Sequence, residues 1–288
     1  MTAINYRIFD SVTQIGKEKW LDLFGDAPEG YGFWKTLEES GFEEHSFFYI
    51  ALFRNSEMVL IAPAMVTDLH VELLTGNGFS CIVRSLRKII PRFFITKTIF
   101  LGSSFDEHGA LGIRKDIPPG EKRSLASELS EIVGRLCNER KIPLAVFKDF
   151  PGMESDTMAG LEEKGYLRID SLPSVLMEVN FASIEDYLKT LSRPRRKDMR
   201  RKLRRARDGG IEIRPVDNID EIIDEIYGLY LKTYEAGSIK FEKLTRDFFA
   251  RITRNISPYA RYFLYYAKGK LAAFNLCFIY KDLFIDKS

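Results

Sequence analysis

The sequence has little cysteine. Its three cysteines, Cys81, Cys137 and Cys277, are far apart, and no two stand at C-x-x-C spacing. A disulfide framework requires paired cysteines, and structural zinc sites take several ligands at short spacings. Neither kind of site is expected, and no metal is predicted. A reducing cytoplasm is the compartment that fits this cysteine content.

Long apolar runs are also missing. The two longest, "MVLIAPAMV" and "LAAFNLCFIY", reach about half of the ~20 residues that a helix needs to cross a bilayer. The start "MTAINYRIFD" lacks the charged and then apolar regions of a signal peptide. We expect a soluble chain with no transmembrane segment, for which a peripheral contact with a membrane stays open.

Common catalytic motifs are absent. The chain has no GxSxG element, no Cys-His pair and no dinucleotide-binding fingerprint, and "TGNG" lacks the lysine of a phosphate loop. "DEHG", Asp106 to Gly109, holds two acids and a histidine, which could suggest a metal site or a general base. Adjacent residues of a turn cannot all converge on one ion, so an exposed loop is the favoured interpretation. A hydrolase has no support.

The residues that are present predict an α/β protein of two domains. The chain has 288 residues, 45% of them apolar, which is enough for two ordinary cores. Strand-like runs, among them "PLAVF" and "SVLMEV", alternate with helical patterns, the clearest of which lies between Leu125 and Leu136.

Two hairpins share one pattern. "FYIALFRNSEMVLIAPAMV" and "YFLYYAKGKLAAFNLCFIY" each follow helices and pair an aromatic-rich strand with a strand rich in small residues. One α/β unit used twice explains this, although hairpins are common enough for coincidence. Only "KDLFIDKS" follows the second hairpin, so we expect the second unit to be incomplete, with an unpaired edge and an uncovered sheet face.

The positive charge is concentrated in one stretch. The formal net charge is only +2, yet Arg193 to Arg207 holds ten basic residues and one acidic residue, a net charge of +9, so the remainder carries about −7. Ser192 and Pro194 suit a helix start, and Gly209 with Gly210 suits a helix end. A helix is predicted here. Its apolar seam would comprise Leu188, Met199, Leu203 and Ala206, with Arg195 on the same side.

Three roles for this helix stay open. It could serve solvation alone, because arginine and lysine are strong helix formers. It could bind nucleic acid, although no aromatic residues interleave with the charges for base stacking. It could also grip a small phosphate-bearing ligand or an acyl carrier. The concentration of charge favours an anionic, phosphate-bearing partner.

The stretch "YLKTLSRPRRKDMRRKLRRARDGGIEI" resembles the start of the second domain in the Fem-like branch of the GNAT superfamily, which includes peptidoglycan-bridge aminoacyltransferases. Arg200, Leu203, Arg204 and Ala206 fill that pattern. The convincing resemblance covers about residues 175–288. It is weaker in the first half, through "YGFWKTLEESG" and "TIFLGSSFDEHGALGI".

The resemblance implies an α/β (α+β) fold of tandem GNAT-like domains, residues 1–172 and 173–288, with mixed sheets flanked by helices. It implies an N-acyltransferase that moves an acetyl or aminoacyl group to an amine, with acyl-CoA or aminoacyl-tRNA as donor. The partners that it implies are an anionic, phosphate-bearing donor or acceptor, tRNA among them, and a cell-envelope precursor. Catalysis would consist mostly of positioning and carbonyl polarisation, so no nucleophile is expected and the catalytic residues stay unassigned. The rival interpretation is a non-catalytic RNA-binding or scaffold protein. The expected phosphate contacts are Arg195, Arg196, Arg200 and Arg204, and the expected cleft residues are Tyr280 and Asp286.

Overall fold

The computed structural model describes residues 4–71, 83, 85–90, 92–109, 111–152, 155–170, 175–237 and 242–287. Contacts between Cα atoms divide the chain into two compact units, Met1–Ser171 and Leu172–Ser288. Each unit contains one β-sheet with helices packed on it. This arrangement confirms the predicted α/β (α+β) class, and assignment of either unit to the GNAT type stays a prediction.

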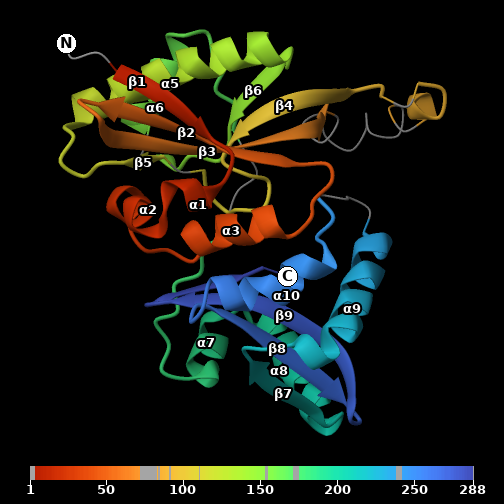
Figure 1. Ribbon diagram of the computed structural model, residues 1–288. Helices are drawn as coiled ribbons and strands as arrows, with labels where there is room; N and C mark the ends of the chain where they lie inside the picture. The colour runs from red at the N-terminus through yellow and green to blue at the C-terminus, as the bar shows by residue number, and fades with distance from the viewer. Residues whose placement is uncertain are drawn as a thin grey trace. The chain divides into compact units, whose positions relative to one another are not determined.

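The first unit is built on a mixed sheet in the order β1-β2-β3-β4-β6, with the short β5 paired to β3. All pairs are antiparallel except β4 with β6. Helices α1, α2 and α3 lie on one face of this sheet and α5 and α6 on the other (Figure 1). The strands are β1 (Ile4–Phe9), β2 (Ser46–Arg54), β3 (Glu57–His70), β4 (Ile95–Leu101), β5 (Gly112–Ile113) and β6 (Leu144–Phe147). The helices are α1 (Val12–Ile15), α2 (Lys17–Phe24), α3 (Tyr31–Glu39), α5 (Pro119–Arg140) and α6 (Ser155–Glu162).

The β2–β3 hairpin forms where the sequence predicts it. Asn55 and Ser56 both take positive φ angles, 50° and 67°, the conformation that a tight two-residue hairpin turn requires. Helices cover both faces of the sheet, so both faces of these strands are apolar, and β3 reads as a nearly continuous buried run.

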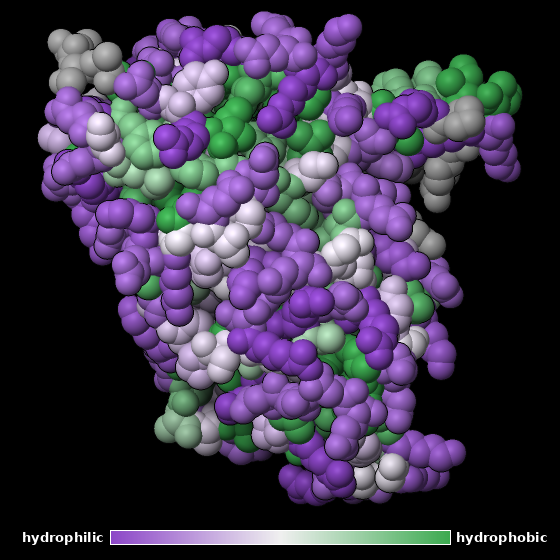
Figure 2. Space-filling model, viewed as in Figure 1, coloured by the Kyte–Doolittle hydropathy of each residue, from purple (hydrophilic) through white to green (hydrophobic). Residues whose placement is uncertain are grey.

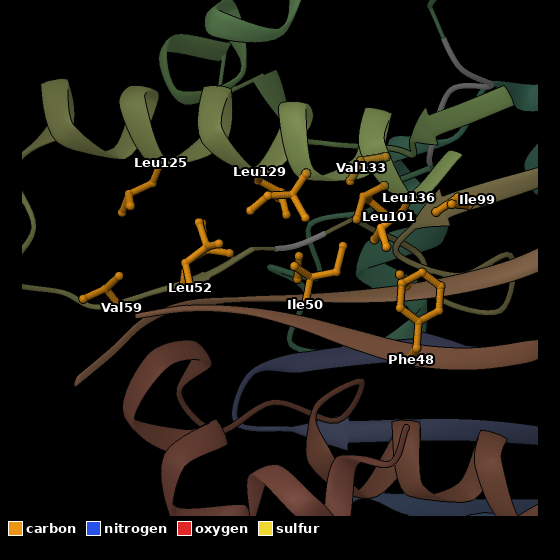
Figure 3. Packing of buried hydrophobic residues seen from close by; sticks show 14 of the residues in the cluster. Phe48, Ile50, Leu52, Val59, Ile99, Leu101, Leu125, Leu129, Val133 and Leu136 are labelled. Atoms are coloured by element: carbon orange, nitrogen blue, oxygen red, sulfur yellow. The ribbon is translucent and has the colours of Figure 1, made fainter. Parts of the chain in front are cut away.

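The core of the first unit lies between α5 and the sheet. Leu125, Leu129, Val133 and Leu136 stand on one side of α5 and point at the strands (Figure 3). Opposite them lie side chains from β2, β3 and β4: Phe48, Ile50, Leu52, Val59, Ile99 and Leu101 (Figure 3). Burial of this apolar layer stabilises the unit.

Helix α5 also connects the one parallel pair of strands in the described sheet. It follows β4 and β5 and leads into β6, so β4 and β6 run in the same direction, with Leu101 beside Phe147. Both strands therefore end at the same edge, and the loops that follow them, Gly102–Gly109 and Lys148–Gly152, lie next to each other.

The second unit is built on an antiparallel sheet in the order β10-β9-β8-β7. Helices α9 and α10 pack on one face of it, and the Tyr262 hydroxyl donates to the Phe249 carbonyl oxygen at 2.7 Å. The strands are β7 (Ile211–Val216), β8 (Ala260–Ala267), β9 (Lys270–Tyr280) and β10 (Leu283–Asp286). The helices are α7 (Ile184–Thr190), α8 (Arg193–Asp208), the 3-10 turn η3 (Asp220–Ile222), α9 (Ile223–Ala236) and α10 (Arg246–Asn255).

The strand predicted for "SVLMEV" is wrong over its described residues. Residues 175–180 form no strand, and Val175 is 96% exposed. The residues are β-prone, but among the residues that the structure describes no strand pairs with them. A pattern of apolar residues cannot show whether a partner strand exists.

The visible surface is mostly hydrophilic (Figure 2). Figure 2 shows hydrophilic residues over most of the visible face, with smaller hydrophobic patches among them. Charged residues make up 29% of the sequence, which accounts for this coverage. Within the described part of the chain, no helix has the length and apolar content that a membrane span demands.

Candidate functional site

The basic stretch forms helix α8, as predicted, but it is separate from the helix before it. Leu191 ends α7 with ψ 149°, and Ser192 has ψ 152°, so the chain is extended between α7 and α8. Gly210 then takes a positive φ of 62° after the last turn, the conformation for which glycine is favoured.

The apolar seam predicted for this helix is wrong. Leu188 is buried, but it belongs to α7, and α8 itself buries no residue. Leu203 is 41% exposed, and Arg195 is exposed rather than directed at a core. Because the chain is extended at Leu191, the apolar face of α7 does not continue onto α8. The position of Leu188 therefore says nothing about which side of α8 is buried.

The four arginines predicted to contact phosphate all lie on α8. Arg200 donates to Glu185 of α7 at 2.6 Å. Arg195, Arg196 and Arg204 make no hydrogen bond or ion pair within the described residues, and Arg196 is half-buried. The helix therefore presents a dense positive charge of which only part is neutralised, by Glu185 and by Asp198.

The two predicted cleft residues are not brought together. Tyr280 pairs with Leu283 at one end of β10 and stacks edge-on against Tyr259, with ring centroids 5.0 Å apart. Asp286 pairs with Cys277 at the other end of β10 and accepts from the Asn275 amide at 3.1 Å.

Asp286 instead lines a depression of about 370 Å³ on the sheet face. Its other lining residues are Ile213, Phe263, Tyr265, Asn275, Cys277 and Phe284. Burial, together with the charge of Asp286, raises the pKa of the Cys277 thiol to about 11. This thiol is therefore protonated at neutral pH and is a poor nucleophile.

A second candidate site lies in the first unit, at the carboxyl ends of β4 and β6. Ligands of open sheets bind outside the carboxyl ends of parallel strands, and this pair is the parallel one. Loop Gly102–Gly109 follows β4, and within it the Ser103 hydroxyl accepts from the backbone N–H groups of Phe105 and Asp106 at 3.2 Å. The Asp106 carboxylate accepts in return from the Ser103 N–H at 3.2 Å.

Other segments hold this loop in place. The Gly109 N–H donates to the Asp149 carbonyl oxygen at 3.1 Å. A Cβ atom at Gly109 would lie 1.8 Å from the Lys148 carbonyl oxygen, so only glycine fits there. The Glu29 carboxylate, in the turn between α2 and α3, accepts from the Glu107 N–H at 3.1 Å.

The surroundings of Asp106 favour its protonated form. Burial, the larger effect, and the negative charge of Glu29 raise the pKa of Asp106 to about 7, against the opposing influence of Lys148 and of the Ser103 hydrogen bonds. A carboxyl group with a pKa near neutrality can both take and give a proton at physiological pH. Perturbed groups of this kind cluster at functional sites.

The sequence predicts only part of this site. Glu107 and His108 are exposed, as predicted for a loop, whereas Asp106 is partly buried and turned inward. The signal that could have found it is the order of elements: strand, glycine-rich acidic loop, long helix, strand, which places the acid at the end of a parallel strand. Among the residues that the structure describes, no group of three or more His, Cys, Asp or Glu side chains is placed to hold a metal ion.

Comparison with known protein families gives a match. The family model FemAB-like, described as peptidoglycan biosynthesis/recognition, matches residues 110–285. The match includes α8 and β10 and begins one residue after the Asp106 loop. No curated protein matches the sequence. Because the family model covers more than half of the 288 residues, the chain belongs to the FemAB-like family of peptidoglycan biosynthesis and recognition.

Proposed function

We propose that the protein transfers an acyl or aminoacyl group from a phosphate-bearing donor, acyl-CoA or aminoacyl-tRNA, to an amine of a peptidoglycan precursor. The family supports the connection with peptidoglycan. The observation that carries the chemistry is the Asp106 carboxyl group, which combines a pKa of about 7 with a place at the carboxyl end of a parallel strand.

The reaction needs a base because the acceptor arrives as an ammonium ion. An alkyl ammonium has a pKa of about 10.4, so it must lose a proton before its nitrogen can attack the donor carbonyl carbon. As the C–N bond forms, the bond between that carbon and the donor oxygen or sulfur breaks. One proton of the ammonium passes to Asp106 and another to the leaving oxygen or sulfur.

Helix α8 supports the phosphate-bearing donor. Arg195, Arg196 and Arg204 offer guanidinium groups without a partner among the described residues, and guanidinium binds phosphate oxygens in a planar, two-pronged geometry. Coenzyme A and tRNA both carry such phosphates, so the charge of this helix fits either donor.

The test is a transfer assay with labelled aminoacyl-tRNA or acyl-CoA and a peptidoglycan precursor that carries a free amine. We expect Asp106→Asn to lower kcat by about 10²- to 10⁴-fold, the usual contribution of a general base. Asp116→Asn is the matched control, because Asp116 is an exposed acid paired with Arg114 in the same unit. Wild-type activity with neither donor, or an Asp106→Asn variant as active as the control, would overturn the proposal.

A second function is RNA binding without catalysis, which the ten basic residues of α8 favour. The two functions differ in how binding is lost. RNA binding by α8 without catalysis should weaken by a similar step with each basic residue of α8 that is removed, whereas a donor site loses binding mainly with Arg195, Arg196 and Arg204. Removing the exposed lysines Lys17 and Lys115 of the first unit should affect neither.

A further inference from the structure

Glu29 is the partner of the Asp106 loop that comes from the greatest distance in sequence. It lies in a tight turn in which the Gly30 N–H donates to the Ala27 carbonyl oxygen at 3.1 Å. A Cβ atom at Gly30 would lie 2.9 Å from that same oxygen, so the turn is closely packed. The Glu29 side chain therefore projects from a backbone with little freedom to move.

Its carboxylate binds the backbone of the loop at Glu107. The Glu107 N–H donates to both Glu29 oxygens, at 3.1 and 3.3 Å. Glu107 is the residue after Asp106, so this bond sets a second negative charge close to the Asp106 carboxyl group. A hydrogen bond from backbone to carboxylate fixes the position of the loop backbone as well as that of the charge.

The charged groups around Asp106 come from three segments. Glu29 faces it from the α2–α3 turn, and Lys148 faces it from the end of β6. Lys148 forms an ion pair with its neighbour Asp149, and both side chains are mostly buried. Within its own loop, Ser103 donates to Asp106, while Glu107 and His108 are exposed.

We propose that Glu29 is a positioning residue for Asp106: its carboxylate anchors loop Gly102–Gly109 through the Glu107 N–H and places a negative charge beside the Asp106 carboxyl group. The inference rests on the proposed function for Asp106 as a base. Repulsion from Glu29 is the second cause, after burial, of the raised pKa of Asp106. Glu29 itself touches no reacting atom in this scheme.

The direct test is carbon-13 NMR of the side-chain carboxyl groups in the full chain. Glu29→Gln keeps an oxygen that can accept from the Glu107 N–H but removes the charge. We expect it to lower the pKa of Asp106 by about 1, the size of effect that a nearby charge produces. Lys148→Gln should raise that pKa. Glu57→Gln, which removes a carboxylate paired with Arg114 in the same unit, should leave it unchanged.

The wild-type chain gives an independent test if Glu29→Gln does not fold. The Glu29 carboxyl resonance should shift near pH 7, because the charge of the nearby Asp106 carboxyl group changes there. A Glu29 resonance that does not change near pH 7, or an unchanged Asp106 pKa in a folded Glu29→Gln chain, overturns the inference.

The outcome for Glu29 is distinguishable from that for the proposed function. If Glu29→Gln lowers the Asp106 pKa while the wild type transfers no acyl group, Glu29 keeps its positioning role and the proposed function fails. If transfer occurs, the Glu29→Gln variant should move the acid limb of the pH profile to lower pH.

Discussion

At the scale of single residues, Asp106 links the stability of the first unit to pH. Its pKa is about 7 in the folded chain against an ordinary value of 3.8, so the folded state binds more protons between these values. The stabilisation is complete below pH 3.8 and is lost as pH rises through about 7.

Asp106→Asn should remove this dependence. Relative to the wild type, the variant should gain unfolding free energy between pH 4 and pH 8, by an amount that approaches about 4 kcal/mol at 1.36 kcal/mol for each pKa unit. Urea unfolding at several pH values measures this. Asp116→Asn is the control, because Arg114 lowers the pKa of Asp116 and leaves it ionised above pH 5. Parallel stability curves for wild type and Asp106→Asn would contradict the prediction.

The position of a single residue can be predicted from the sequence when its contact partners are close to it in the sequence. The exposure of Glu107 and His108 follows from their place in a polar loop. The inward position of Asp106 depends on Ser103, on Glu29 and on the end of β6. Two of these three partners are distant in sequence, so a motif of four adjacent residues could not show them.

At the scale of elements, the sequence predicts where α8 starts and ends, but not which residues surround it. Its start and end follow from Pro194 and from the two glycines, which act locally. The face that it presents depends on where α7 ends, and the break at Leu191 cannot be placed from periodicity. The hairpins were predictable for the same local reasons, whereas the parallel pairing of β4 with β6 joins strands more than 40 residues apart.

The ion pair between Arg200 and Glu185 gives α8 a testable electrostatic property. Both side chains are about half exposed, so the pair adds little to stability. Glu185→Gln should leave unfolding unchanged and raise affinity for tRNA about twofold, with a slightly steeper dependence on salt, because Arg200 becomes available to phosphate.

The matched control for this prediction is Glu212→Gln. Glu212 pairs with Arg214 on β7, outside α8, and the substitution removes the same charge. Filter binding at several salt concentrations measures both variants. An equal gain in the two would show that only net charge matters and that α8 is not the binding element.

At the scale of the whole molecule, the two sheets differ in how they are covered. In the first unit, α5 covers the face that carries Ile50 and Leu101. In the second, α9 and α10 cover one face, while on the other Ile213 and Phe284 are 55% and 56% exposed.

Exposed apolar surface of this kind should bind hydrophobic dyes and promote self-association. We expect the chain to increase the fluorescence of anilinonaphthalene sulfonate. The double substitution Ile213→Lys and Phe284→Lys should reduce both this fluorescence and the self-association measured by analytical ultracentrifugation. Leu167→Lys, at an exposed leucine of the first unit, is the control. A fluorescence signal that survives the double substitution would locate the exposed surface elsewhere.

The close approach of Gly109 to the Lys148 carbonyl oxygen predicts a sequence pattern for chains that share this loop. A substitution there must move the end of β6, so a library that varies all positions of the loop should return glycine alone at this one. The pattern of a glycine, an acid four residues later and a second glycine three residues after it, placed at the end of a strand, is then a signature of the folded loop. It stands just before the region that the family model matches, and searching for it would select those relatives that share the Asp106 arrangement.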